Sequence, residues 1–313
     1  MMLETEAKSG NYERTTRESW PTEGYVFNTT LSKCENGGEL SWDDEKKVVL
    51  MSGNVSDKCY VYFDVYVSPR FDEICDETTL ACHVAKLYTG TQGENGIYYH
   101  DSSLTNGAGD SSYRYSGANP NNYVCFGSNE STCPTDNLYR IIGVFGNQVK
   151  LIKYDYGTTD ELGTDGDYSK TYKEWGMDST YKGTYGDGER IGVYYWNNAT
   201  QTNTWSESLL NKTNLNTNFI NNIGEEWANK IATTTWKVGG NTYSNIYSKT
   251  PSVVYQNEIV NPVTTNTTDN ATEYTAKIGL MYVSDYGFAA EPTAWTLTMG
   301  NYNNTTATST NWM

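Results

Sequence analysis

The chain has 313 residues, more than one ordinary domain needs, and its 22 Lys and Arg against 38 Asp and Glu give a formal net charge of −16. This negative charge repels nucleic-acid phosphates and anionic lipid, so neither is expected as a partner. Charged residues make up only 19% of the chain, whereas Tyr occurs 27 times and Trp 9 times. That composition is typical of exposed β-structure and of recognition surfaces.

The first 19 residues are polar, and we expect residues 1–19 to be disordered. The sequence shows no signal peptide and no apolar run near the roughly 20 residues that span a bilayer. We therefore expect no membrane span in this chain, and we expect a longer exported protein of which both ends are missing here.

Six cysteines fall along the chain as three neighbouring pairs. Sequence alone cannot choose among the possible pairings, but loop closure favours nearest neighbours. The expected disulfides are Cys34–Cys59, Cys75–Cys82 and Cys125–Cys133. Disulfides imply an oxidising compartment, so the expected location is extracellular or on the cell surface, with reduced cytosolic thiols as the alternative. No pair has the C-x-x-C spacing of a redox or zinc site, and we expect no metal and no cofactor.

Residues 20–68 carry the first strand patterns. Apolar and polar side chains alternate from Lys58 to Val67, which predicts a half-buried strand. The segments "ELSW" and "KKVVLM" flank the acidic "DDE" and predict a hairpin. A segment of about 50 residues buries only a small apolar core, so a disulfide between its strands would add needed stability. We expect residues 20–68 to form a small antiparallel β-domain of the sandwich type.

Residues 69–120 are expected to link two domains. The stretch "TTLACHVAKLYTG" places Leu80, Val84 and Leu87 at helical spacing and ends on Gly90. His83 lies beside this apolar stripe, where an ordinary helix residue is the simpler interpretation than a catalyst. The Gly-, Asn- and Ser-rich stretch that follows predicts a long loop.

The second domain, residues 121–313, opens on the strongest local pattern. Two apolar runs in "LYRIIGVFGNQVKLIKYDY" flank Gly146-Asn147, a favoured two-residue hairpin turn. The bridge Cys125–Cys133 would hold the entry loop to this hairpin. Apolar spacing from Leu210 to Ile231 predicts two helices with a break at Gly224, and "TAKIGLMYVSDYGFAA" predicts a late buried strand.

An acidic insertion follows the hairpin. Counted from Asp165, the sixth and twelfth positions of an EF-hand would be Lys170 and Gly176, so that motif does not fit. A calcium site of another kind at Asp165 and Asp167 is the weaker alternative to a solvated acidic loop.

The sequence lacks the common motifs of nucleophilic and phosphate chemistry. There is no G-x-S-x-G, no P-loop and no G-x-G-x-x-G after a strand, and both histidines precede the second domain. We therefore expect no catalytic residues. A pair of acidic residues in a cleft, as in glycoside hydrolases, stays an alternative because such residues need not be close in sequence.

The insertion from Gly157 to about residue 192, and the residues just after it, are dense in aromatic side chains. Aromatic rings can stack on sugars, whereas burial within the fold is the competing interpretation for each ring. The ligand-binding candidates are Trp175, Tyr181, Tyr185, Tyr195 and Trp196.

Three pieces of the second domain carry a resemblance to a known family: "NPNNYVCFGS…TCPTDNLYRIIGVFGNQVKLIK", "WSESLLNKTNLNTNFI" and "IGLMYVSDYGFA". The chain resembles uncharacterised secreted or surface proteins of Gram-positive gut bacteria. That family is similar to C-type-lectin-like domains, including the target proteins of diversity-generating retroelements. Its W…L…L-N…F pattern is matched by Trp205, Leu210, Leu215, Asn216 and Phe219.

The match has two departures. One extra residue lies between Leu210 and Leu215, and Asn214 stands where the family often has a second Trp. In the relatives, a carboxy-terminal stretch that closes on a V-R-P block carries the ligand-contacting residues, and the present sequence ends at Met313 without it. The resemblance thus implies a C-type-lectin-like domain that is incomplete at its carboxyl end, and it transfers no binding residue.

The sequence therefore predicts a β-rich α+β protein: a small disulfide-stapled antiparallel β-domain followed by a C-type-lectin-like α+β domain. The expected function is a non-enzymatic extracellular or cell-surface binding or adhesion module, which presents Tyr-, Asn- and Gly-rich loops to a glycan or protein ligand. The alternatives are a carbohydrate-active hydrolase that uses two acidic residues and a pilin-like structural surface component. The ligand and the oligomeric state do not follow from the sequence.

Overall fold

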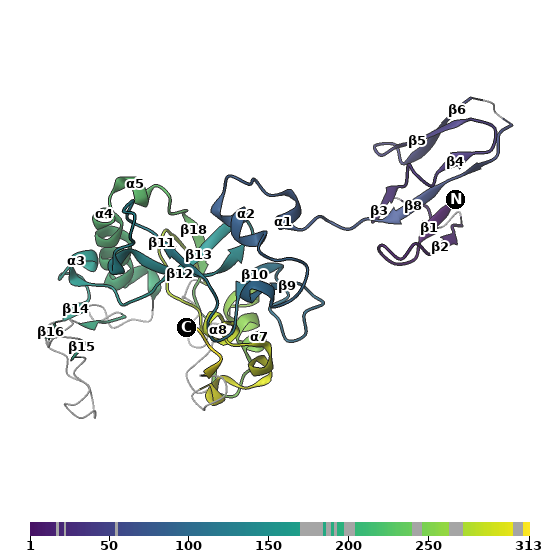
Figure 1. The fold of residues 1–313 in the computed structure, drawn as a ribbon. Coiled ribbons are helices and arrows are strands. Elements are labelled where there is room, and N and C mark those ends of the chain that lie inside the picture. Colours follow the sequence, from purple (N-terminus) through teal and green to yellow (C-terminus); the bar gives the residue numbers. More distant parts are fainter. Residues whose placement is uncertain are drawn as a thin grey trace. The chain divides into compact units, whose positions relative to one another are not determined.

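The computed structural model describes residues 1–16, 19–21, 23–53, 56–169, 184–185, 189–190, 193–196, 204–239, 246–262, 272–302 and 309–313. It shows a mixed α+β chain, rich in β-structure, with two compact units (Figure 1). Unit 1 is Met1–Arg70 and unit 2 is Phe71–Met313. Within these ranges no helix combines the length and the apolar character that crossing a bilayer requires.

A four-stranded sheet forms unit 1 together with two short strand pairs. The sheet order is β2 (Tyr12–Arg14), β1 (Met2–Glu4), β8 (Tyr62–Val65) and β3 (Tyr25–Phe27). The pairs are β5 (Glu39–Asp43) with β6 (Val48–Ser52) and β4 (Lys33–Cys34) with β7 (Cys59–Tyr60). The hairpin β5–β6 is the one predicted from "ELSW" and "KKVVLM". The unit is not purely antiparallel, however, because β1 runs parallel to β8.

The described part of residues 1–19 differs from the expected disordered segment, because it supplies β1 and β2. The reason lies in Glu4, which is buried and accepts hydrogen bonds from the amides of Gly10 and Val65, both at 3.0 Å. Its carboxylate thus ties the β1–β2 turn to β8. The polar composition of this segment does not reveal the two strands, because the contact that orders them is made by a buried charged side chain.

Three aromatic rings make the centre of unit 1. Phe63 of β8 is fully buried, with Trp42 at 4.8 Å and Phe27 at 5.5 Å between ring centroids. The disulfide Cys34–Cys59 joins β4 to β7 at a Cα–Cα distance of 4.0 Å. The predicted crosslink therefore supports a unit with a small apolar core.

The central sheet of unit 2 is built on β12 (Leu138–Phe145). One edge of β12 pairs with β13 (Gln148–Lys153), and the other pairs with β11 (Tyr123–Cys125) and β10 (Ser112–Tyr115). β10 pairs in turn with β9 (Ile97–His100). The predicted hairpin β12–β13 is confirmed, and Gly146 takes a φ of +60° at the first turn position, the position a type II′ turn reserves for glycine.

Residues 69–120 differ from the expected linker, since they belong to the core of unit 2. They form α1 (Phe71–Ile74), α2 (Leu80–Ala85), β9 and β10. Tyr113 and Tyr115 of β10 pack in one cluster with Ile97 of β9 and with Ile141 and Val144 of β12. Strands of four residues inside a Gly- and Ser-rich stretch give too short a period-two pattern to stand out from a loop.

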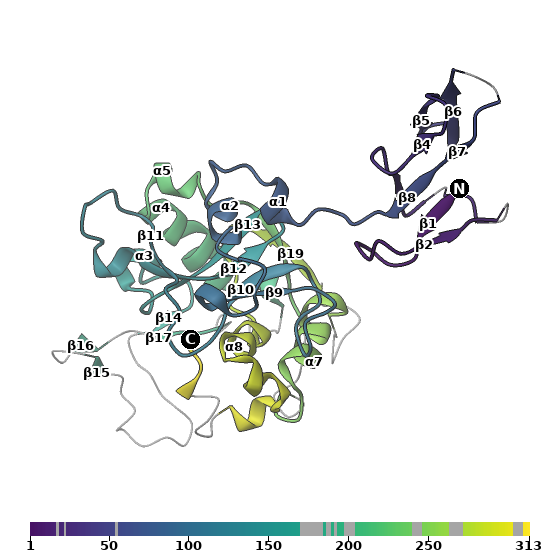
Figure 2. The same ribbon diagram turned by 45° about the vertical axis from the view of Figure 1, so that its right-hand side comes forward.

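Helices lie on both sides of this sheet (Figures 1 and 2). Tyr113 points to one side, where its hydroxyl bonds to Asp72 of α1. Arg114, the next residue, points to the other side, where it contacts α8 (Val283–Ala289). Trp312, near the carboxyl end, is buried against the sheet and donates to the Tyr115 carbonyl at 2.9 Å.

The predicted helical region after Trp205 is present. A π-helix spans Leu210–Phe219, α4 spans Ile220–Asn222 and α5 spans Glu225–Ala228. Gly224 separates α4 from α5 with a φ of +86°, so the predicted break is confirmed.

The remaining elements are short. The helices are α3 (Thr159–Leu162), α7 (Pro251–Tyr255), the π-helix Gln256–Val260 and the 3₁₀ turns Glu94–Gly96, Thr135–Asn137, Trp205–Glu207, Pro292–Thr296 and Met299–Asn301. The strands are β14 (Tyr168–Ser169), β15 (Thr184–Tyr185), β16 (Glu189–Arg190), β17 (Val193–Tyr194), β18 (Thr234–Lys237) and β19 (Glu273–Ala276).

The late strand predicted from "TAKIGLMYVSDYGFAA" is wrong beyond Ala276, where β19 ends. Among the described strands, the partner of β19 is β18. Asn216 fixes the backbone just after this point. Its side-chain N–H donates to the carbonyl of Ile278, and its side-chain oxygen accepts from the Ile278 amide, both at 3.0 Å. The carboxylate of Asp285 then accepts from the amide of Tyr282 at 3.1 Å and starts α8. These side-chain contacts override the apolar pattern, and they leave Leu280 and Met281 exposed.

Candidate ligand-binding groove

A cavity of about 800 Å³ lies in unit 2 along β13. We call it the β13 groove and define it by its main lining segments: β13 itself, the β18 strand, residues 277–282 and Asp285 of α8. Residues of α2 also line it, so the cavity draws side chains from both sides of the central sheet. Every residue of β13 is part of this lining, so the groove follows that strand.

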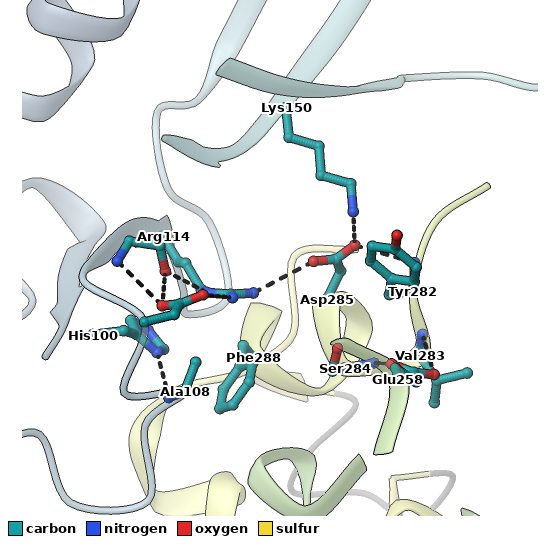
Figure 3. Close-up of polar contacts among 12 residues, drawn as sticks. His100, Ala108, Arg114, Lys150, Glu258, Tyr282, Val283, Ser284, Asp285 and Phe288 are labelled. Atoms are coloured by element: carbon teal, nitrogen blue, oxygen red, sulfur yellow. Dashed lines mark hydrogen bonds and ion pairs between the residues drawn. The ribbon is translucent and has the colours of Figure 1, made fainter. Parts of the chain in front are cut away.

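Four charged side chains, two of them buried and two partly buried, form a network at the floor of the groove (Figure 3). Arg114 donates to Asp110 at 2.7 Å and to Asp285 at 3.4 Å, and Lys150 donates to the other oxygen of Asp285 at 2.5 Å. The side chains of Arg114 and Asp285 are each only 2% exposed. Ser112 completes the arrangement, because it accepts from the Arg114 Nε at 2.8 Å and donates to Asp110.

Each member is positioned by its own element. Arg114 stands on the face of β10 opposite Tyr113, and Lys150 extends from β13. Asp285 occupies the third position of α8, where it also bonds to the amide of Tyr282. The network therefore joins β10, β13 and α8 across the base of unit 2.

Aromatic rings surround both cations. Arg114 lies over Phe145 at 4.6 Å and Phe288 at 5.0 Å from the ring centroids. Lys150 lies over Tyr282 at 4.0 Å and Trp236 at 5.4 Å. Cation–π contacts of this kind stabilise a desolvated charge.

Burial shifts the pKa of several acids and bases near the groove. It lowers the pKa of Lys150, and the carboxylate of Asp285 opposes that shift. Burial also raises the pKa of Glu258, although this side chain accepts from the amides of Val283 at 3.2 Å and Ser284 at 3.0 Å. Burial acts on Asp110 in the same direction, but the charge of Arg114 and the hydrogen bonds from Ser112 and Arg114 together hold the pKa of Asp110 below its ordinary value.

His100 is buried beside this network and packs against Phe288 and Trp295. Burial, with help from Arg114, holds its pKa well below the ordinary value, so the imidazole is neutral at physiological pH. Its Nδ1 accepts from the amide of Ala108 at 3.1 Å. This contact fits a structural role rather than that of a general base.

The expected ligand-binding residues are only partly described. Trp175 and Tyr181 lie outside the described residues, as does the side chain of Tyr185. Tyr195 donates its amide to the carbonyl of Asp167 at 2.9 Å. Trp196 is 38% exposed and stacks on a buried ring, that of Trp205, at 4.7 Å. Neither Tyr195 nor Trp196 lines the β13 groove.

The two aspartates considered for calcium have other partners. Asp167 is buried and accepts from the amides of Leu209 and Leu210, both at 3.1 Å, where it caps the π-helix Leu210–Phe219. Asp165 accepts from the side-chain amide of Asn218 at 2.6 Å. Among the described residues, the one group with the spacing of metal ligands is Cys34, Asp57 and Cys59, and its two sulfurs are joined to each other.

The remaining disulfides both lie in unit 2. Cys75–Cys82 links α1 to α2, and Cys125–Cys133 closes the connection between β11 and β12. All six cysteines are paired as the sequence predicts.

Sequence reasoning missed Arg114, Lys150 and Asp285. Arg114 sits between two tyrosines in "SYRYS", and Asp285 interrupts the apolar "MYVSDYGF". A charge inside an apolar or aromatic run was the available signal, because such a residue is buried only when it is paired.

The fold and the groove thus define a disulfide-bonded α+β protein with a cationic, aromatic-lined cavity in its larger unit. Comparisons of the chain with protein-family models, with curated proteins and with solved structures found no match.

Proposed function

We propose that the protein is a non-enzymatic extracellular or cell-surface binding module, and that the β13 groove holds its ligand, a glycan or a protein. The observation that carries this proposal is the groove itself. A cavity of about 800 Å³ with aromatic walls and a few charged groups has the size and composition of a ligand site. The carboxylate at its floor, Asp285, is held between Arg114 and Lys150, which favours a fixed scaffold over proton transfer.

The three disulfides support an extracellular or surface location, since such crosslinks persist in oxidising compartments. Each joins segments close in sequence, and none is a redox motif. A rigid crosslinked platform suits recognition outside the cell.

We also propose the C-type-lectin-like arrangement for unit 2. Two of the motif pieces that carry the resemblance contact each other, because Asn216 bonds to the backbone of Ile278 in both directions. These two residues lie 62 positions apart in the sequence, and their contact supports the proposal that the two motifs belong to one common fold.

The test is an array of glycans and extracellular proteins probed with the labelled full chain. Leu280 is 47% exposed and lines the groove, so Leu280→Asp places a charge where the ligand would lie. Val253, 44% exposed on α7 and outside the groove lining, provides the matched control Val253→Asp. We expect bound probes to lose about tenfold or more of their signal with Leu280→Asp and to keep it with Val253→Asp.

Binding to no probe, or an equal loss with both variants, would contradict the proposal. Shortened glycan products on the array would contradict its non-enzymatic part and favour the hydrolase.

A further inference from the structure

We propose that the β13 groove takes an extended acidic segment of a partner protein, which adds to the outer edge of β13 as a further strand. This inference rests on the proposed function and narrows the ligand to one class. It is carried by the backbone of β13 and by the charge of the groove.

The outer edge of β13 offers backbone donors and acceptors. Among the strands of the described ranges, β13 pairs with β12 alone. Ile141 of β12 donates its amide to Asn122, on the side of β12 away from β13, so its partner Leu151 directs its own amide away from β12. The amide of Val149 also points away from β12. Phe145 and Gln148 form the hydrogen-bonded pair beside the two-residue turn, so the next pair, Val144 and Val149, is not hydrogen-bonded.

The groove gives this edge room for another strand. Every residue of β13 lines it, together with Thr79–Ala81 on one side of the sheet and Ser284–Asp285 on the other. Alternate side chains of an added strand would therefore meet both walls.

The charge of the groove is opposite to that of the whole chain. The cationic side chains in its lining are Arg114, Lys150, Lys153, Lys230, Lys237 and Lys277. The acidic ones are Asp110 and Asp285, and both are already paired with Arg114. A groove that gathers so much positive charge on a chain of net charge −16 fits an acidic partner.

The lysines do have partners of their own. Lys150 pairs with Asp285 inside the groove, and Lys153 pairs with Glu161, outside it, at 2.7 Å. Lys230 pairs with Glu226 at 3.0 Å on the surface, and Lys237 pairs with Glu273. Lys277 donates to a backbone carbonyl, that of Ala228. Surface pairs of this kind contribute little to stability, so a ligand carboxylate can share or replace them.

Exposed apolar side chains complete the match. Leu280 and Met281 line the groove and are 47% and 42% exposed. A segment that alternates acidic and apolar residues would place carboxylates by the lysines and apolar groups on these side chains. A glycan lacks the repeated N–H and C=O groups that a strand edge recognises, so the free edge favours a polypeptide.

The probe is a capped peptide of about eight residues that alternates Glu and Val, long enough to cover one strand. Its control replaces each Glu with Lys. Fluorescence anisotropy with the full chain should show saturable, salt-sensitive binding of the acidic peptide and no binding of the basic one.

Two pairs of variants test the two parts of the inference. Lys277→Glu should weaken binding about tenfold or more, whereas Lys212→Glu, an equal change of charge at an exposed residue outside the groove, should leave it unchanged. Val149→Pro removes an outward amide while it keeps the bonds to β12, and it should weaken binding about tenfold. Val149→Ala keeps that amide and should lower the affinity by less than about threefold. Far-ultraviolet circular dichroism checks that each variant folds.

Binding that Val149→Pro leaves intact would overturn strand addition. Failure of the peptide to bind, while an array glycan still loses its signal with Leu280→Asp, would overturn this inference and leave the proposed function standing. Failure of both would overturn both. Self-association of the chain that Lys277→Glu abolishes, seen by analytical ultracentrifugation, would assign the groove to a second copy instead of a partner protein.

Discussion

Asp285 is the residue on which the buried charges of unit 2 depend. It contacts two cations, Arg114 and Lys150, and it starts α8 through the amide of Tyr282. The two cations lie 171 and 135 residues away in the sequence. One carboxylate therefore links three elements that local sequence patterns treat separately.

Replacement of Asp285 by Asn should destabilise the protein strongly. The change removes the anion that Lys150 and Arg114 share and leaves Arg114 with Asp110 alone. Loss of one partner from a buried pair costs about 3–5 kcal/mol. Denaturant titration of the full chain measures the free energy of unfolding. Glu226→Gln removes an exposed pair with Lys230 in the same unit and serves as the control, with little expected change. Equal effects of the two variants would argue against the network.

Glu258 should make stability fall as the pH rises. Burial raises its pKa above the ordinary 4.5 in the folded chain, so the folded state holds the proton more tightly than the unfolded state does. The stabilisation from this group is complete below pH 4.5 and is lost as the pH rises through the folded pKa.

Glu258→Gln removes that titration and keeps an oxygen for the amides of Val283 and Ser284. The unfolding free energy of the wild type minus that of the variant should fall as the pH rises from 4.5 through the folded pKa of Glu258. Denaturant titrations across this range measure the difference, and a difference that is constant or rises with pH would refute the assignment.

At the scale of elements, β12 and β13 organise unit 2. Their two-residue turn fixes the register, and the disulfide Cys125–Cys133 closes the segment that brings β11 onto β12. The staple thus acts on β11 and its connection, whereas the hairpin has its own turn and ladder.

Removal of the disulfide Cys125–Cys133 should lower the free energy of unfolding while the protein stays folded. The double variant Cys125→Ser, Cys133→Ser frees a loop whose ends are 8 residues apart, and in the chain-entropy model its closure contributes about 2.5 kcal/mol. Denaturant titration gives the loss of unfolding free energy. Relative to the wild type, hydrogen exchange in the variant should speed up more in β11 than in β13. Global loss of protection at both strands would contradict a local role.

Local patterns predicted the elements that local chemistry controls. The β5–β6 and β12–β13 hairpins, helix α2 and the break at Gly224 each carry their own turn or cap residue. Nearest-neighbour loop closure likewise predicted the disulfides. These features need no knowledge of distant contacts.

Contacts between distant segments account for the differences. β9 and β10 are too short to show a period, and they form because β12 offers them an edge. The stretch 277–282 reads as a strand, but Asn216 and Trp236 hold it in another conformation. The groove was not predictable for the same reason, because its charged floor comes from β10, β13 and α8.

At the scale of the whole molecule, the two units differ in the size of their cores. Unit 1 has one buried ring, Phe63, at the centre of its described core and a crosslink between its strands. The large clusters of buried side chains and the β13 groove all belong to unit 2. We therefore propose that recognition takes place in unit 2.

Hydrogen exchange of the full chain with and without the acidic Glu-Val peptide tests this placement most directly. If the peptide adds to β13, the outward amides of Val149 and Leu151 must gain protection when it binds, because each acquires a carbonyl partner. We predict slower exchange at these two amides in the complex. Protection confined to the region of Trp196, or unchanged exchange at Val149 and Leu151 in the saturated complex, would contradict it.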